Sequence, residues 1–592
     1  MNPETLKQQC PTLAGNIASA LADPQTDRFS DDDAMFLKAH GVYQGDDRDL
    51  RKSGVKKHIF MVRVRIPGGI LTAPQYLALD ELADRYGNGT LRVTSRQGLQ
   101  IHHVVKSNLR ALVKAINETS LTTLGACGDN NRNVVAPPAP AMDAMGARVQ
   151  QHAREVALAL APATPAYHAI WMDGVVPNIG ADFVDPLYGK SYLPRKFKVG
   201  FAIPPVNDVD IFSHCCGFIA IADTGSGLLG YNLLAGGGMG RSHGNKATYP
   251  RLADTIGFLP ADRVVEVARV VFTIHRDFGS RTDRKHARLK YVLADRGAAW
   301  FRQELETRLG FKLEDVRPFQ FTEQSDRFGW HPQTDGRLFL GLFVETGRIR
   351  GAFKAALRTV VEKFQPQIRL TPNNNVILAN IMPADRPEIE RWLAGHDDAG
   401  VVRRASMACV ALPTCGQAIA EAERYLPQWI TEFEALLAEI GLSGEPITVR
   451  MTGCPNGCAR PYTAEIGLVG KSPGLYKSGS AAMRPTRAST VSTAKWSRHP
   501  TSSRSCAPCW SATRLSDIPA NDSATGQRGL WSFHHDPVGD YTLGRRAGSR
   551  DCVHQLSPLR GGHLTSGDTS AAQHSGAVGG SRMQPPGHVP VC

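Results

Sequence analysis

The alternation of apolar and polar positions is the same in two segments that lie far apart in the chain. Each segment has the pattern of a strand ending in a turn, then a helix, then a second strand. These elements are expected at Ile59–Gly69, Ala73–Tyr86 and Leu91–Val104 in the first segment, and at Leu338–Arg348, Ala352–Phe364 and Ile368–Ile381 in the second. Two related α/β halves that meet at a shared groove explain this repeat, although two unrelated α/β units could agree by chance. Thr94 and Thr371 favour the repeat, because each begins the polar interruption of its last strand.

Basic residues are concentrated on one copy of the repeat. Arg63, Arg65, Arg92 and Arg96 lie in the strands of the first copy, whereas the matching positions of the second copy are mostly apolar or Asn. This difference is expected if the first half grips an anionic ligand.

The remaining patterns divide the chain into six segments of an α+β protein. Strand and helix patterns alternate between the two halves and predict a central α/β domain. After the second half, four cysteines surround a predicted helix at Ala418–Ile440. The segment His40–Gly54 has mixed charges and glycines, so we expect loop or an extended arm there. The expected segments are an N-terminal arm at 1–55, the halves at 56–124 and 331–396, the central domain at 125–330, the cysteine domain at 397–476 and a tail at 477–592.

The tail differs in composition from the rest of the chain. Glu465 is the last Glu, and after Lys477 Ser, Thr, Arg, Gly, Pro and His become dense. The apolar residues of the tail show neither a helical nor a strand period, so we expect no buried core and no regular structure there.

Length and charge limit the class of protein. A chain of 592 residues is too long for one core, and 42% hydrophobic residues are typical of globular proteins. No apolar run approaches the roughly 18 residues of a membrane span, and Met1–Pro24 lacks the pattern of a secretory signal. We therefore expect a cytoplasmic location without membrane contact, where cysteines are more often metal ligands or free thiols than disulfides. The net charge of +13 is spread in short clusters beside Gly, Pro and Asn, which favours pockets for small anions over nucleic-acid binding.

Four cysteines form the sharpest motif. Cys409 and Cys415 make one close pair, and Cys454 and Cys458 make a second pair after the predicted helix. Thiolates are soft ligands that suit iron–sulfur clusters or zinc. Structural zinc sites usually have closer pairs and often include His, so the spacing favours a 4Fe–4S cluster. Zinc, in a nucleic-acid-binding module, and free core cysteines stay open as alternatives.

The segments Ala408–Cys415 and Thr452–Cys458 resemble the signature of the nitrite and sulfite reductase family, whose members couple siroheme to a 4Fe–4S cluster. The resemblance covers roughly residues 40–476. Within the family, the chain resembles the assimilatory sulfite reductases most. It implies that all four cysteines bind the cluster, and that Cys458 also binds the siroheme iron. It further implies reduction of sulfite to sulfide with six electrons, with siroheme nitrite reduction as the alternative.

The same resemblance assigns residues to cofactor and substrate. The segment Thr94–His102 resembles the strand that cradles siroheme, whose carboxylates need many cationic partners. The residues assigned to siroheme are Arg92, Thr94, Arg96, Gln100, His102, Arg195, Arg288 and Cys458. The residues assigned to sulfite are Arg63, Arg132, Lys196 and Lys198. Lys196 and Lys198 lie two apart on a strand pattern and should share a face. Lys198 favours sulfite over nitrite, since the nitrite enzymes of the family tend to have Asn there.

Two further motifs are weaker evidence of function. Gly236–Gly240 is rich in glycine but lacks the spacing of a dinucleotide-binding loop, and Cys506 with Cys509 has metal-like spacing in a segment without a second pair. With no nicotinamide or flavin motif in the chain, electrons are expected from a partner protein. The segment His40–Gly54 resembles the NADPH-linked form, which implies a flavoprotein partner, while ferredoxin stays possible.

The resemblance ends at Val469–Tyr476. In the family this segment continues into further strands and helices of the cluster domain, whereas here it continues with the tail. We hypothesise that the reading frame shifts near Lys477, so that residues 477–592 are a non-native translation. A natural disordered extension is the competing hypothesis.

Overall fold

The computed structural model describes residues 2–54, 56–173, 183–223, 225, 227–396 and 398–479, together with the backbone of three short strands between 519 and 545. All of these belong to one compact unit, Met1–Arg546. No helix in this described part is long and apolar enough to cross a membrane.

The two copies of the repeat form two five-stranded sheets that exchange a strand. The first sheet has the order β1-β2-β5-β4-β12 and the second β10-β11-β14-β13-β3. Strand β3 comes from the first copy but pairs in the second sheet, and β12 does the reverse. The bounds are β1 Val42–Asp46, β2 His58–Val64, β3 Ile70–Leu71, β4 Leu91–Val93, β5 Leu99–Val104, β10 Gly329–Pro332, β11 Leu338–Leu342, β12 Arg348–Ile349, β13 Gln367–Leu370 and β14 Val376–Ile381. The reciprocal exchange is what a pseudo-twofold repeat requires.

A helix follows the first strand in each copy, as predicted. Helix α4 spans Ala73–Tyr86, where Thr72 and Gln75 form a capping box at its start. Helix α11 spans Gly351–Phe364, one residue longer than predicted. The two helices contact each other, and the buried Asp80 of α4 lies 3.0 Å from Arg358 of α11. Helices α5 Leu109–Glu118 and α12 Arg386–Leu393 complete the two halves.

The last strand predicted in each copy is a pair of strands around a turn. Thr94 begins one turn and its hydroxyl oxygen accepts hydrogen bonds from the backbone N–H of Arg96 and Gly98. Thr371 begins the other and accepts from the N–H of Asn373 and Asn375. The same threonine function in both copies supports the repeat.

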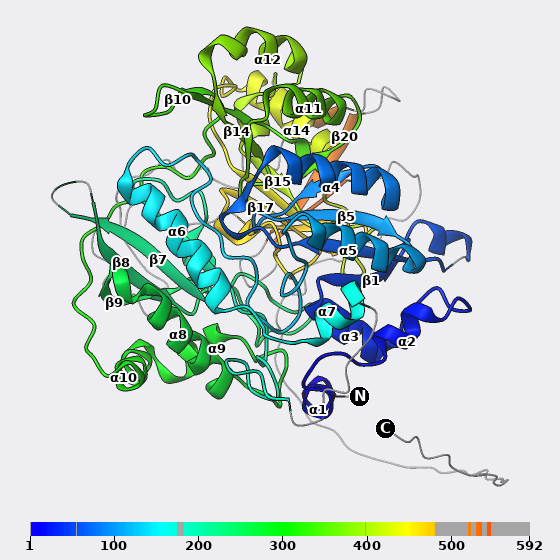
Figure 1. Cartoon of the computed structure of the whole chain (residues 1–592). Coiled ribbons are helices and arrows are strands. Elements are labelled where there is room, and N and C mark those ends of the chain that lie inside the picture. Colours follow the sequence, from blue (N-terminus) through cyan, green and yellow to red (C-terminus); the bar gives the residue numbers. More distant parts are fainter. Residues whose placement is uncertain are drawn as a thin grey trace, which may run out of the picture. The chain divides into compact units, whose positions relative to one another are not determined.

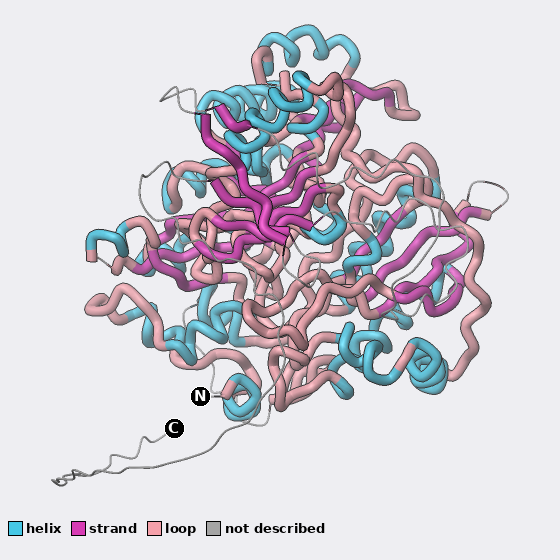
Figure 2. Tube along the Cα trace, turned by 180° about the vertical axis from the view of Figure 1, so that it is seen from behind, coloured by secondary structure: helices cyan, strands magenta, loops and turns pink. Residues whose placement is uncertain are grey.

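The central domain has a four-stranded sheet, β6-β7-β8-β9, set apart from the other strands when seen from the front and from behind (Figures 1 and 2). Its strands are β6 Val199–Ala202, β7 Cys216–Ala222, β8 Leu228–Ala235 and β9 Asp254–Pro260. Its helices are α6 Ala144–Ala159, α7 Ala166–His168, α8 Val264–Phe278, α9 Leu289–Arg296 and α10 Ala298–Leu309. Helix α8 packs between α6 and α10, and its buried face joins the main hydrophobic core, which continues into both halves.

The N-terminal arm has more regular structure than predicted. It contains α1 Pro3–Gln9, α2 Ile17–Ala22 and α3 Asp31–Ala39, and the segment predicted as loop or extended arm supplies strand β1, which pairs with β2. Asn2 and Ser30 cap α1 and α3, and apolar side chains such as Phe36 and Leu37 are buried in the main core. The mixed charges of the segment concealed this short amphipathic pattern.

The cysteine domain is built on parallel strands and one long helix. It contains α13 Val401–Arg404, β15 Ser406–Ala408, α14 Leu426–Glu439, β16 Val449–Thr452, β17 Ile466–Ser472 and β18 Leu475–Gly479. The helix starts later than predicted, because Pro427 favours the first turn of a helix and residues 418–425 form turns instead. Its apolar face packs in a second hydrophobic core with Val449 and Met451 of β16.

Three strands of the tail continue the sheet of the cysteine domain. The order is β15-β16-β17-β18-β21-β20-β19, with β19 Pro519–Asn521, β20 Arg528–His535 and β21 Tyr541–Arg545. The sequence pattern did not indicate these three strands, because the apolar residues of the tail have no strand period. Strand β18 offers unpaired backbone groups at its edge, and β21 pairs with them. The rest of the tail, including Cys506 and Cys509, lies outside the described residues.

The remaining short helical turns are 3-10 helices at Leu50–Ser53, Pro67–Gly69, Lys106–Asn108, Ile211–Ser213, Ala261–Arg263, Glu345–Gly347, Pro383–Asp385 and Pro461–Thr463, and a π-helix at Ala169–Asp173.

Candidate active site

One cavity of about 920 Å³ lies where the arm, the first half, the central domain and the cysteine domain meet. A cavity of this size is at the upper end for ligand sites. The predicted residues that line it are Arg63, Arg92, Thr94, Gln100, His102, Arg132, Arg195, Lys196, Cys409, Cys415, Cys454 and Cys458. Arg96, Lys198 and Arg288 are not among the lining residues. Most of the predicted site thus converges on one place.

Adjacent parallel strands bring the two cysteine pairs together. Cys409 follows directly after β15, and Cys454 comes two residues after the end of the neighbouring strand β16. All four cysteines are free thiols. All four line the same cavity. Four thiols around one cavity can hold a polynuclear cluster, in which each thiolate binds a different iron.

The surroundings of Cys409 and Cys454 disfavour the charged thiolate form. Burial, with the neighbouring Cys458, raises the pKa of Cys454 to about 12 and that of Cys409 well above its usual range. The N–H of Gly453 donates to the Cys409 sulfur at 3.3 Å. A side chain at Gly453 would place its Cβ 2.4 Å from the Ala420 carbonyl oxygen, so only glycine fits between the two loops.

The residues predicted to bind sulfite surround a common region. Arg63 donates to the Cys127 sulfur at 2.9 Å and to the Gln100 carboxamide oxygen at 3.1 Å. Arg132 donates to the Gly128 carbonyl oxygen at 2.8 Å. Lys196 and Lys198 precede β6 rather than lying on it, but the fully buried Phe197 between them fits their shared orientation away from the core. The segment is extended, although the strand starts later than the pattern predicts.

Burial and neighbouring cations lower the pKa of both lysines. Burial, together with Arg195, Arg288 and Arg132, lowers the pKa of Lys196 to about 7. Burial and Arg96 lower the pKa of Lys198 well below its usual value. Lys196 can therefore gain or release a proton near neutral pH.

Asp129 is a site residue that the sequence did not reveal. This buried carboxylate accepts two hydrogen bonds from Arg284, at 2.7 and 2.9 Å, and lies 3.7 Å from Arg195 and 3.5 Å from Lys7 of α1. Burial alone would raise the pKa of Asp129, but these cations outweigh it and hold the pKa at about 2. The carboxylate thus orders Arg195 beside the cavity. Its position three residues before Arg132 was the available signal.

Several predicted siroheme residues make contacts within the protein. The Arg96 guanidinium donates to the carbonyl oxygens of Asn133 and Val199. Arg288 donates to Gly237 O and to the Cys215 sulfur, both at 3.4 Å, and its guanidinium fills the space that a side chain at Gly238 would need. Gly238 therefore allows close packing against Arg288, and Gly237 packs against the backbone of Phe212 and His214.

Buried polar atoms without a partner mark where a ligand is needed. The Asn130 carboxamide oxygen and nitrogen and the Nε of Arg241 have no hydrogen-bond partner, and both residues line the cavity. The Nε of Arg288 is also unpartnered. Buried polar groups almost always have partners, and donors of this kind suit a ligand with many carboxylates. The residues present fit siroheme beside a thiolate-bound cluster.

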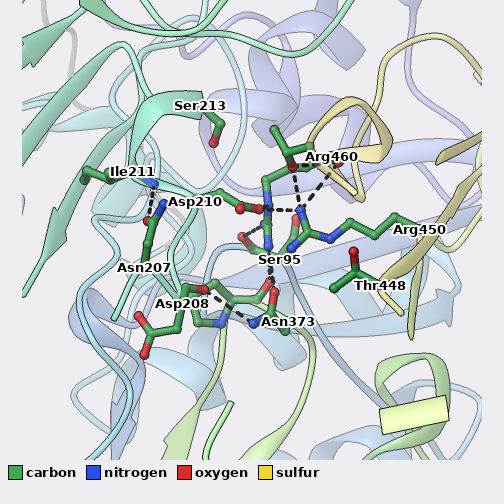
Figure 3. Close-up of polar contacts among 12 residues, drawn as sticks. Ser95, Asn207, Asp208, Asp210, Ile211, Ser213, Asn373, Thr448, Arg450 and Arg460 are labelled. Atoms are coloured by element: carbon green, nitrogen blue, oxygen red, sulfur yellow. Dashed lines mark hydrogen bonds and ion pairs between the residues drawn. The ribbon is translucent and has the colours of Figure 1, made fainter. Parts of the chain in front are cut away.

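A buried ion-pair group joins Asp210 to Arg450 and to Arg460, which is two residues after Cys458 (Figure 3). Asp210 accepts from Arg450 at 2.5 Å and from Arg460, and Arg460 also donates to the Ser95 and Pro372 carbonyl oxygens. Asp210 thereby joins the central domain to the cysteine domain, and Arg460 joins the cysteine domain to both halves. Sequence patterns gave no sign of this group, because its members are far apart in the chain.

Comparison with known proteins decides the family. Residues 51–119 and 331–395 match the model of the nitrite/sulfite reductase ferredoxin-like half domain, and residues 152–313 match that of the nitrite and sulphite reductase 4Fe-4S domain. This chain belongs to the nitrite and sulfite reductase family. The family prediction and the α+β fold with two ferredoxin-like halves are confirmed.

Individual relatives agree with this assignment. The chain is 47% identical over 487 residues to the sulfite reductase (NADPH) hemoprotein beta-component of Myxococcus xanthus, covering 80% of this chain and 86% of the relative. It is 49% identical over 479 residues to the protein of the same name from Methylobacterium nodulans, covering 78% and 79%. The solved structure of the Mycobacterium tuberculosis NirA protein has the same fold, with a TM-score of 0.66 at 24% identity over 81% of this chain and 86% of that chain.

Proposed function

We propose that this chain is the catalytic haemoprotein component of a sulfite reductase, which reduces sulfite to sulfide with six electrons. The observation that carries this proposal is the single cavity that brings four thiols from two loops together with Arg63, Arg132 and Lys196. Relatives named as this component, at 45–49% identity, support it.

The chain would hold two joined cofactors in the cavity. Cys409, Cys415, Cys454 and Cys458 would hold a 4Fe–4S cluster, and Cys458, the exposed member of the set, would also hold the siroheme iron. Asn130 and Arg241, with their unpartnered polar atoms, would meet siroheme carboxylates. When bound, the two cofactors would pass electrons from the donor protein and supply the iron on which sulfite is reduced.

The protein's own contribution is to bind the anion and supply protons. Arg63 and Arg132 are anchored through Cys127, Gln100 and Gly128, so their positive charges are fixed beside the cavity. Preorganised cations attract a small oxyanion and stabilise negative charge that develops on it. Lys196, whose pKa is about 7, can deliver a proton at neutral pH and be reprotonated. This division of roles among the four predicted substrate residues is part of the proposal.

Nitrite is the competing substrate, since the family includes both activities. Lys198 supports sulfite, because a second lysine beside Lys196 favours an anion of higher charge. The relatives in the comparison also have the name of the sulfite enzyme.

The electron donor would be a flavoprotein that uses NADPH. The relatives are called the beta-component of an NADPH enzyme, which implies a second component. A ferredoxin is the alternative donor. The test is sulfide production by the purified protein with reduced viologen, then with an NADPH flavoprotein component and with ferredoxin. Sulfide with viologen supports the catalytic assignment, and the better natural donor decides the partner; absence of sulfide with every donor would refute it.

A further inference from the structure

Two buried arginines from the two halves of the repeat lie directly opposite each other. Arg92 of β4 pairs with Arg348 of β12 in the antiparallel ladder, and their residues are 3% and 9% exposed. Like charges at directly opposed positions destabilise a sheet, and burial strengthens the repulsion. A specific compensating charge is therefore needed.

Glu423 of the cysteine domain supplies that charge. Its carboxylate accepts from Arg92 Nε at 2.9 Å and from Arg348 Nε at 2.7 Å and NH2 at 3.0 Å. Burial alone would raise the pKa of Glu423, but the two guanidinium groups outweigh it and lower that pKa. The three side chains are thus two cations and one anion, which leaves one net positive charge in a poorly solvated place.

Arg92, Glu423 and Arg348 form a triad, and Arg92 bonds it to the loop that contains Cys409. The NH2 of Arg92 donates to the carbonyl oxygen of Ala408 at 2.8 Å, and Ala408 is the residue before Cys409. Both Ala408 and Cys409 line the cavity, as does Arg92 itself. The guanidinium charge therefore lies one peptide unit from a predicted cluster ligand.

Arg348 makes a second contact between the triad and the cavity wall, through His102. Its NH1 donates to Nδ1 of His102 at 2.9 Å. Burial and the two arginines lower the pKa of His102 well below its usual value, so the ring is neutral. Because Nδ1 accepts the Arg348 hydrogen bond, the proton is on Nε2, and the imidazole is fixed as a donor in the cavity wall.

We propose that the Arg92–Glu423–Arg348 triad is an electrostatic tuning element that sets the reduction potential of the cluster bound by Cys409. This inference rests on the proposed function. Reduction adds negative charge to a cluster, and charges and hydrogen bonds around a cluster set its potential. The net positive charge of the triad stabilises the reduced state. The negative charge of Glu423 weakens this stabilisation of the reduced cluster. Arg92 is the positive charge of the triad that lies nearest to Cys409.

The sign of the effect gives the test. Glu423→Gln keeps the shape of the side chain but removes the anion, so the midpoint potential of the cluster rises. Arg92→Gln removes the nearest cation, so the midpoint potential falls. A purely structural role for these residues would not shift the potential in opposite directions. Glu421→Gln is the matched control. It removes one negative charge two residues from Glu423, and the Glu421 side chain is 32% exposed in an ion pair with Arg424, where solvent screens it.

The measurement is a potentiometric titration of the loaded full-length protein, followed by electron paramagnetic resonance of the reduced cluster. We expect opposite shifts for the two triad variants and none for Glu421→Gln. Shifts in one direction only, or no shift, would overturn the tuning role while leaving the proposed function in place. If Glu423→Gln does not fold, Arg92→Gln and Arg348→Gln decide, since both must lower the potential. A wild-type protein that binds no iron overturns the proposed function and the tuning role with it.

Discussion

The hydroxyl of Ser95 donates a hydrogen bond of 3.0 Å to the backbone carbonyl oxygen of Cys458. The Ser95 carbonyl oxygen in turn accepts from Arg460, two residues after Cys458. The turn between β4 and β5 is therefore fastened to the Cys458 loop at two points, and Asp210 holds Arg460 in place. Contacts from the first half, through Ser95, and from the central domain, through Asp210, therefore hold the Cys458 loop.

Replacing Asp210 tests this arrangement. Asp210→Asn leaves Arg450 and Arg460, both buried, without their carboxylate. Breaking one partner of a buried ion pair costs about 3–5 kcal/mol, so we expect the free energy of unfolding in urea to fall by that order. The variant should also bind less iron, because the Cys458 loop loses its anchor. Asp335→Asn, which breaks an exposed pair with Arg337, is the control and should change neither quantity. Equal behaviour of the two variants would mean that the Asp210 group does not hold the loop.

The bridging role of Cys458 predicts a loss of both cofactors. Cys458→Ser removes the thiolate that would belong to the cluster and to the siroheme iron, so iron content and siroheme absorption should fall together. Cys10→Ser, in the arm and outside the cavity lining, should leave both unchanged. Normal siroheme absorption and full sulfite turnover in Cys458→Ser would refute the bridge.

Substrate choice is tested at Lys198. Lys198→Asn removes a basic side chain beside Lys196 that we assign to the anion, and a more highly charged anion loses more Coulomb energy when a positive charge is removed. We expect kcat/KM for sulfite to fall more than kcat/KM for nitrite. Lys190→Asn, at an exposed position of the same domain, should affect neither. Equal losses for both substrates at Lys198 would remove the reason to prefer sulfite.

Lys290 gives a prediction about pH. This buried lysine donates to the carbonyl oxygens of Gly238, Gly240 and Tyr249, and burial lowers its pKa to about 7. Between pH 7 and the ordinary value of 10.5, the unfolded chain holds the proton and the folded chain does not, so stability rises with pH. The free energy of unfolding of the wild type, relative to Lys290→Met, should rise by up to about 1.4 kcal/mol per pH unit between pH 7.5 and 9. A difference that stays constant with pH would show that the three carbonyls keep the lysine charged.

Removing the tail distinguishes the two hypotheses about it. If β19–β21 belong to the folded sheet, a chain that ends at Gly479 exposes the edge of β18 and should be less stable and more prone to aggregate. If residues 477–592 are a non-native translation, the truncated chain should be as stable as the full one. The matched relatives cover about 80% of this chain, and the unmatched fifth has the length of the tail. Comparing urea midpoints of the two chains, and resequencing the DNA around codon 477, distinguishes the hypotheses.

Local patterns predicted the elements that depend on local chemistry. Helix α4 has the predicted bounds because Thr72, Pro74 and Gln75 start it and an apolar stripe continues it. The four cysteines, and Thr94, Gln100 and His102 of the Thr94–His102 segment, all line the cavity. The prediction was poorer where contacts between distant segments decide the structure. Glu423 and Asp210 each neutralise arginines from other domains, and Asp129 neutralises Arg284, 155 residues away in the chain. No periodicity or spacing reveals such pairings.

The same reason explains why the sequence did not reveal the protein contacts of Arg92. Arg92 has a strand position and charge suited to an anionic cofactor, but its guanidinium is bonded to Glu423, Thr346 and Ala408. Only the fold brings Glu423 to this arginine. Direct contact of Arg92, Arg96 and Arg288 with siroheme stays a prediction.

The central claim is that one cavity holds siroheme and a 4Fe–4S cluster for sulfite reduction. The most direct measurement combines the visible spectrum and iron content of the purified full-length protein with its electron balance during turnover. The account predicts siroheme absorption, iron from one cluster and one siroheme per chain, and six electrons consumed from reduced viologen for each sulfide released from sulfite. A colourless protein with zinc in place of iron, or a loaded protein that releases ammonia from nitrite but no sulfide from sulfite, would contradict it.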